Sequence, residues 1–125
     1  YSCNQVMKAG IGEYFLLCNN DIELPQNCLD EFERIFVDDP KAGIIGGQIL
    51  DSNKNKVGSS FPAPTFISEL DSIGRVKKSK QNTGIQEAGA LSGACLAVRS
   101  STIESAGMMD DDFFFYYEET EWCMR

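Results

Sequence analysis

The chain contains no histidine, and this absence narrows the chemistry that it can carry out. Histidine is the side chain most often used as a general acid or base near neutral pH, and it is the commonest ligand of transition metals. Any acid–base chemistry here must therefore use carboxylates, lysine, tyrosine or cysteine. Basic residues are also few, because 11 lysines and arginines face 19 aspartates and glutamates and give a net charge of −8. Nucleic-acid binding needs clustered basic residues, so we expect no nucleic-acid partner.

Long apolar runs are missing as well. No stretch of the sequence approaches the roughly 20 apolar residues of a membrane-spanning helix. The cysteines are odd in number, widely spaced and without a C-x-x-C pair: Cys3, Cys18, Cys28, Cys95 and Cys123. This usage favours free thiols in a reducing compartment, and Cys95 and Cys123 are interpreted as small buried hydrophobic residues. We therefore expect a soluble, cytoplasmic domain, and contact with the inner face of a membrane stays open.

The clearest structural signal is a short apolar run at residues 14–18, which ends in Asn19-Asn20-Asp21. At 125 residues the chain has the size of one domain with its own core. A continuous apolar run of this length predicts a strand that is covered on both faces, as in parallel sheets. Ligands of open α/β sheets bind at the carboxyl ends of such strands. With Pro25 opening the next helix, the pattern predicts a strand, an acidic turn and a helix.

Elements elsewhere follow from periodicity, glycine and proline. We expect the end of a helix and a glycine turn in residues 1–13, and a strand at 42–50 with a hairpin into Val57. A long polar excursion follows at 59–87, with one short helix near 66–73. We then expect a strand ending at Arg99, a helix from a capping box at Ser101 and Glu104 to Gly107, and a new helix after the aromatic run. The excursion carries four basic residues, Arg75, Lys77, Lys78 and Lys80. They form either a solvated loop or a surface that attracts an anionic substrate or lipid headgroups.

Two groups of polar residues are candidates for chemistry. Asn19-Asn20-Asp21 offers the oxygen ligands that Mg²⁺ or Mn²⁺ prefers, although the same residues are common turn formers and helix caps. Glu118 and Glu119 follow an aromatic run, where a partly desolvated carboxylate could act as a general base. The alternative is that these glutamates are first-turn acids favoured by the helix dipole. Glu121 also has the spacing of an ion pair with Arg125.

The residues between these groups have their own alternatives. Asp110, Asp111 and Asp112 have the character of turn and cap residues. The aromatic run at residues 113–117 favours a core role, with a sugar-binding platform at Tyr116 or Tyr117 as the alternative.

Three segments, taken in order, resemble family 2 glycosyltransferases: residues 12–21 (GEYFLLCNND), 91–99 (LSGACLAVR) and 114–125 (FFYYEETEWCMR). The similarity covers nearly the whole chain, and the last motif is the most specific. The nearest subgroup is the rhamnosyltransferase-like enzymes of bacterial surface polysaccharide assembly. The resemblance implies a GT-A fold, which is an α/β fold with a Rossmann-like mixed sheet flanked by helices. It also implies inverting transfer of a sugar from a nucleoside-diphosphate sugar to a hydroxyl of a saccharide or lipid-linked saccharide.

The resemblance assigns roles to individual residues. Asn19-Asn20-Asp21 matches the D-x-D element of the family, so Asp21 is the candidate ligand of Mg²⁺ or Mn²⁺. Glu119 matches the general base that takes the proton of the acceptor hydroxyl. The substrate-binding candidates are Asn19, Asn20, Ser92, Gly93, Asp110 and Glu118.

The chain also departs from the family pattern. Asn19 replaces the first Asp of the D-x-D element, and Glu119 replaces the usual Asp base. The N-terminal nucleotide-binding strands of the family have no counterpart here, so the resemblance implies that residues 1–125 are one partial catalytic domain, inactive alone. Two alternatives stay open: a non-catalytic GT-A-like domain that binds a sugar or a partner, and a homo-oligomer formed through exposed sheet edges.

Overall fold

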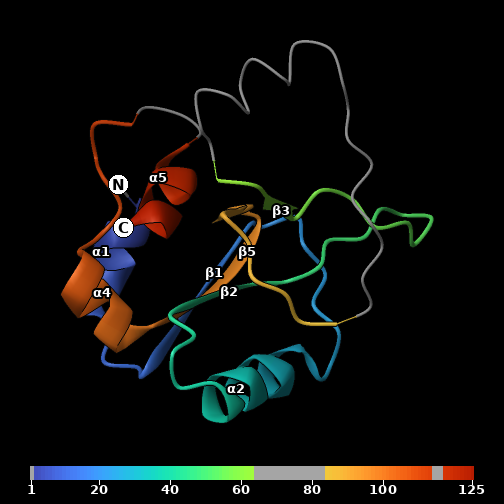
Figure 1. Ribbon diagram of the computed structural model, residues 1–125, viewed down its shortest axis with the longest axis horizontal. Coiled ribbons are helices and arrows are strands. Elements are labelled where there is room, and N and C mark those ends of the chain that lie inside the picture. The colour runs from blue at the N-terminus through green and yellow to red at the C-terminus, as the bar shows by residue number, and fades with distance from the viewer. Residues whose placement is uncertain (1, 64–83, 114–116) are drawn as a thin grey trace.

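The computed structural model describes residues 2–63, 84–113 and 117–125, and these form a mixed α/β architecture (Figure 1). The elements are α1 (Ser2–Ala9), β1 (Tyr14–Cys18), α2 (Cys28–Asp38), β2 (Ile44–Gly46), β3 (Ser60–Phe61), β4 (Ala90–Leu91), β5 (Cys95–Arg99), α4 (Ser100–Ala106) and α5 (Glu118–Met124). No helix among these described ranges is long and apolar enough to cross a membrane.

The central sheet has the strand order β1-β5-β2. Strand β5 runs antiparallel to both neighbours, so β1 and β2 point in the same direction. The register places Cys18 opposite Cys95 at one end of the sheet and Tyr14 opposite Arg99 at the other. Strands β3 and β4 form a separate antiparallel pair. The predicted strand at residues 14–18 is confirmed. The expectation that it lies in a parallel sheet is wrong, because β5, the strand beside it, is antiparallel to it.

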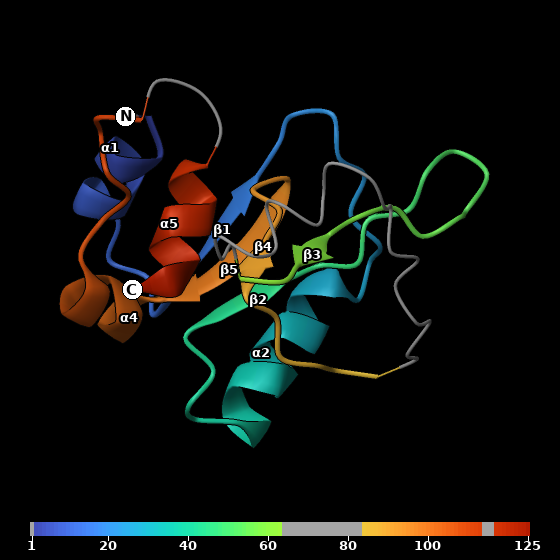
Figure 2. The ribbon, with the colours of Figure 1, turned by 45° about the horizontal axis from the view of Figure 1, so that its top comes forward.

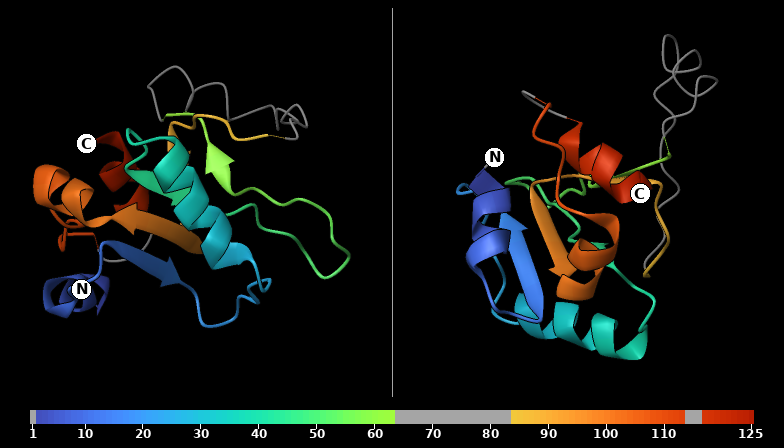
Figure 3. Two further views of the ribbon diagram at one scale, coloured as in Figure 1. Left: turned by 90° about the horizontal axis from the view of Figure 1, so that it is seen from below. Right: turned by 90° about the vertical axis from the view of Figure 1, so that its left-hand side faces the viewer.

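Helices cover both faces of the central sheet (Figures 2 and 3). On one face, Phe32 and Phe36 of α2 pack against Cys95 and Ala97. On the other face, Trp122 of α5 joins the cluster that is completed by Met7, Leu17, Leu96 and Val98. Alternate residues of β5 thus enter different cores, because neighbouring side chains of a strand point to opposite faces. Residues 14–18 are apolar because helices cover both faces of the sheet. This burial is the same whether the neighbouring strand is parallel or antiparallel.

Three boundaries differ from the sequence prediction. Helix α2 begins at Cys28 instead of Pro25, whose carbonyl accepts a hydrogen bond from Cys28 N (3.0 Å) in a turn before the helix. The predicted strand at 42–50 shortens to β2, although its hairpin closes through a bridge between Leu50 and Lys56. The expected short helix near 66–73 and the four basic residues lie outside the described residues.

Helix α4 corrects the predicted capping box and confirms the predicted end. The helix begins at Ser100, directly after β5, and its N-cap residue Arg99 makes no side-chain capping hydrogen bond. A capping box at Ser101 and Glu104 is therefore wrong. Gly107 ends the helix with φ of 80°, a left-handed value that glycine adopts without strain.

Arg99, at the end of β5, joins the sheet to α2, the helix that covers the face of Cys95 and Ala97. Its guanidinium donates hydrogen bonds to Phe36 O (2.7 Å) and Ala42 O (3.3 Å). The same group lies over the stacked rings of Tyr14 and Phe36, with 5.4 Å and 4.9 Å to their centroids. These contacts satisfy one carbonyl in the last turn of α2 and one in the segment before β2, and they fix the helix against the sheet.

Candidate functional site at the carboxyl edge of strand β1

Two of the predicted segments meet where β1 and β2 end and β5 begins. Asn19 N donates to Ala94 O (3.0 Å), which extends the β1–β5 ladder past Cys18. At the neighbouring strand, Gly47 N donates to Cys95 O (3.1 Å). The turn that holds Ser92 and Gly93 therefore lies beside Asn19, at the carboxyl edge shared by β1 and β2.

The Asn19-Asn20-Asp21 segment forms an exposed turn. Ile22 N approaches Asn19 O at 3.4 Å, and all three polar residues are exposed. This geometry confirms the turn-forming role of the segment. It also leaves the Asp21 carboxylate accessible at the end of β1.

Glu119 lies against the same turn. Helix α5 begins at Glu118, after Tyr117 with φ of 72°. A Cβ atom placed on Gly93 would lie 3.3 Å from Glu119 Cδ and 3.5 Å from its Oε1. The absence of a side chain at Gly93 therefore provides room for the Glu119 carboxylate. One turn later on α5, burial and then the nearby Glu119 carboxylate raise the pKa of the Cys123 thiol.

The tight approach at Gly93 gives a direct prediction. In Gly93→Ala the new methyl group would press on Glu119 Cδ, so the Glu119 side chain must move by a few tenths of an ångström. If Glu119 is a catalytic base, we expect kcat for sugar transfer to fall by up to about tenfold, because a displacement of about 1 Å at a reacting group can cost about 10²-fold and this one is smaller.

The matched control is Gly84→Ala, because a Cβ at Gly84 meets no atom of the described residues within 4 Å. The measurement is kcat of both variants alongside thermal denaturation. A Gly93→Ala variant with wild-type kcat would show that the position of Glu119 does not govern the reaction.

Ser92 and Glu118 complete this part of the site. Ser92 N donates to Ser59 O (3.0 Å), and Ser92 Oγ accepts from Ala94 N (3.4 Å), so the turn is held from two sides. Glu118 Oε2 is buried and has no hydrogen-bond partner among the described residues. A buried acceptor without a partner costs free energy unless a ligand or water donates to it. Glu121 Oε2 also makes no hydrogen bond of good geometry among the described residues, but it forms the predicted ion pair with Arg125 Nη2 (2.9 Å).

Asp110 takes part in a different arrangement. Its carboxylate accepts a hydrogen bond from Asp112 N (2.9 Å), which is the turn-forming alternative stated above. The turn is tied to α1, because Asn4 Nδ2 donates to Met109 O and to Asp111 Oδ1, both at 2.8 Å. Among the described residues, the Asn19–Ala94 hydrogen bond and the approach of Gly93 to Glu119 bring Asn19, Gly93 and Glu119 together. Asp110 takes part in neither contact.

Sequence reasoning missed the glycines at the end of β2. A Cβ on Gly46 would lie 2.9 Å from Leu91 Cδ2, and one on Gly47 would lie 3.5 Å from Cys95 Sγ. The tight approach at Gly46 lets Leu91 of β4 pack against the end of β2, whereas the distance at Gly47 is an ordinary van der Waals contact. Two adjacent glycines after an apolar run are the sequence signal that marks this place.

The described residues hold no group of three or more His, Cys, Asp or Glu side chains arranged to bind a metal. All five cysteines are free thiols. Comparisons of the chain with protein-family models, with curated proteins and with solved structures found no match.

Proposed function

We propose that the chain is a catalytic domain of the GT-A type, which transfers a sugar from a nucleoside-diphosphate sugar to an acceptor hydroxyl with inversion. The observation that carries this proposal is the meeting of the three resembling segments. Asn19 is hydrogen-bonded to Ala94, and the neighbouring Gly93 lies against Glu119. Residues about a hundred positions apart in sequence therefore share one edge of the sheet, where ligands of α/β proteins bind.

The polar groups at this edge fit a hard divalent cation. Asp21 supplies an exposed carboxylate, and Asn19 and Asn20 supply amide oxygens from the same turn. Mg²⁺ commonly binds through one or two carboxylates together with substrate phosphates and water, so a group of three protein ligands is not required. We propose that Asp21 holds Mg²⁺ or Mn²⁺ together with the diphosphate of the donor. When bound, the cation supplies stabilisation of the negative charge on the departing nucleotide.

Glu119 is the proposed base. Its position on the first turn of α5, against Gly93, places a carboxylate beside the turn that meets Asn19. There it would take the proton from the acceptor hydroxyl as the oxygen attacks the anomeric carbon. Glu118 Oε2, which has no hydrogen-bond partner among the described residues, offers an acceptor for a second hydroxyl of a bound sugar.

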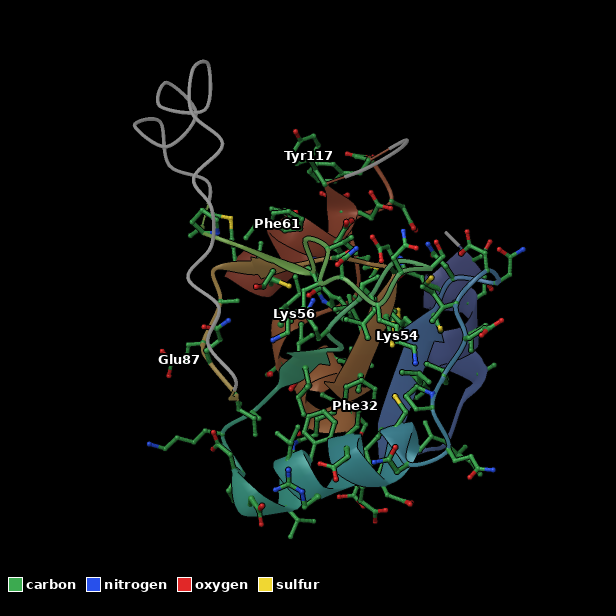
Figure 4. All side chains as sticks on the ribbon, turned by 90° about the vertical axis from the view of Figure 1, so that its right-hand side faces the viewer. Phe32, Lys54, Lys56, Phe61, Glu87 and Tyr117 are labelled. Atoms are coloured by element: carbon green, nitrogen blue, oxygen red, sulfur yellow. The ribbon has the colours of Figure 1, made fainter. Side chains whose placement is uncertain are left out.

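Tyr117 favours binding of a saccharide acceptor next to this base. The side chain is 65% exposed at the start of α5, so it is not part of the core (Figure 4). Phe61 of β3 is a second exposed aromatic, at 47%. Aromatic faces pack against the apolar faces of sugar rings, so we assign the platform alternative to Tyr117.

Asp21→Asn tests the metal and donor part of the proposal. Calorimetric titration of UDP-, GDP- and dTDP-sugars with Mn²⁺ into the protein that carries this chain should detect one bound donor. In Asp21→Asn we expect its affinity to fall at least tenfold, about 1.4 kcal/mol, because the anionic ligand is lost. The control Asp30→Asn changes an exposed carboxylate of α2 and should bind as the wild type does. Absence of binding to every donor would refute the proposal.

A further inference from the structure

Three of the five thiols gather at one end of the sheet, on the face covered by α2. Cys18 ends β1 and lies opposite Cys95, the first residue of β5. Cys28 begins α2 and packs against the cluster that contains Cys95 and Phe32. The carboxyl edge of β1 thus carries a cluster of three cysteine thiols next to the proposed site. The proposed function does not use these thiols.

The ladder shows which kind of pair Cys18 and Cys95 form. Asn19 N donates to Ala94 O, and at the other end Ser100 N donates to Glu13 O (2.8 Å). Hydrogen-bonded pairs alternate with non-hydrogen-bonded pairs along an antiparallel ladder. Cys18 is one residue before Asn19, so its pair with Cys95 is of the non-hydrogen-bonded kind.

This kind of pair has the spacing that a disulfide needs. Cα atoms of a non-hydrogen-bonded pair lie about 4.5 Å apart, and disulfides join Cα atoms about 4.4–6.8 Å apart. Directly opposite residues also point to the same face of the sheet. The two sulfurs are also close enough for Cys18 to contribute to the raised pKa of Cys95. The backbone therefore needs little movement to join the two sulfurs.

We propose that Cys18 and Cys95 are a redox-active pair that forms a reversible disulfide when the protein meets a hydroperoxide. Cys18 is exposed, whereas Cys95 is only 3% exposed, so the oxidant reaches Cys18 first. The inference concerns covalent chemistry of the cysteines and holds whether or not the chain transfers sugars.

The reaction balances in two steps. The Cys18 thiolate attacks the outer oxygen of the hydroperoxide, which breaks the O–O bond and leaves Cys18 as a sulfenic acid and the peroxide as an alcohol or water. The Cys95 sulfur then attacks the sulfenic sulfur, the S–S bond forms, and the sulfenic oxygen leaves as water. Two thiols lose two electrons and two protons, and one hydroperoxide is reduced.

The environment of Cys95 fits the role of the second thiol. Burial, followed by the nearby Cys18 and Cys28 sulfurs, raises the pKa of the Cys95 thiol to about 11. Cys95 therefore stays protonated near neutral pH and resists direct oxidation, and its thiol proton leaves with the sulfenic oxygen as water when it attacks the activated Cys18. Burial and then Cys18 also raise the pKa of Cys28, the other thiol that could resolve Cys18.

Mass spectrometry of the oxidised protein tests the proposal. The protein is treated with hydrogen peroxide, the remaining thiols are alkylated, and the linked peptides are identified. We expect free thiols in this chain to fall from five to three, with Cys18 linked to Cys95. A reducing agent should restore all five. A dominant link through Cys28, or oxidation of Cys18 without any intramolecular link, would overturn the proposal.

Variants separate this pair from general thiol oxidation. Cys18→Ser changes an exposed residue and should abolish the link, whereas Cys3→Ser, on α1, should leave its yield unchanged. Cys28→Ser should also retain the link. Hydrogen exchange gives a second readout, because the disulfide lies one residue from the Asn19 N–Ala94 O hydrogen bond. Oxidation should slow exchange of the Asn19 amide, and an unchanged or faster rate would argue against a link at this rung.

Discussion

Replacing Glu119 with glutamine is expected to reduce sugar transfer by about 10²–10⁴-fold, the usual contribution of a general base. Glutamine keeps the length of the side chain and its contact with Gly93, but its amide cannot accept the proton of the acceptor hydroxyl. Donor binding should stay close to that of the wild type, because Asp21 and the turn around it are unchanged. The loss should therefore appear in kcat and not in the dissociation constant of the donor.

The measurement compares initial rates of transfer by the wild type, Glu119→Gln and the control Glu104→Gln. Glu104 is an exposed residue of α4, and its variant should transfer sugar at the wild-type rate. Full activity of Glu119→Gln would remove Glu119 from the mechanism. A wild-type protein that binds the donor but transfers nothing would favour the non-catalytic, sugar-binding alternative.

Replacing Trp122 with alanine is expected to lower the free energy of unfolding by about 3–5 kcal/mol. Trp122 is 1% exposed and belongs to the cluster that joins α5 to the sheet. Its Nε1 donates to Gly107 O (2.8 Å), the carbonyl that follows α4. Truncation would leave a cavity under the helix that carries Glu119. The loss is a large part of the roughly 5–15 kcal/mol that stabilises a typical domain.

Trp122→Phe serves as the matched variant, because it retains much of the ring and removes the hydrogen bond. We expect it to cost less than the alanine variant, since most of the buried apolar surface stays in place. Urea denaturation of the three proteins, with equal m-values, measures both differences. A loss below about 1 kcal/mol for Trp122→Ala would contradict the assignment of Trp122 to a close-packed core.

The sequence was most informative where one local pattern dominates. Residues 14–18 are apolar without interruption, and they form β1 with the predicted bounds. Gly107 ends α4 because glycine adopts the left-handed conformation without strain, and Glu118 begins a helix as expected. These outcomes depend on local backbone preferences and on burial, which are visible in short segments.

Predictions that depend on distant partners were weaker. The antiparallel neighbour of β1 lies some eighty residues away, and an apolar run does not reveal its direction. The capping box at Ser101 failed because β5 continues directly into α4, which moves the start of the helix to Ser100. The fit between Gly93 and Glu119 is a tertiary contact, so only the resemblance suggested that these residues belong together.

Paramagnetic relaxation by Mn²⁺ tests the central proposal most directly, because it locates the cation relative to both sides of the site. In NMR spectra recorded with Mn²⁺ and a nucleoside diphosphate, we predict broadening of the amide signals of Asn19, Asp21, Gly93 and Glu119. The amide of Glu104 on α4, which follows the opposite end of β5, should be broadened much less, and Asp21→Asn should remove the selective broadening. Broadening centred elsewhere, or equal broadening in Asp21→Asn, would contradict the proposal that this edge of the sheet binds a metal and a nucleotide.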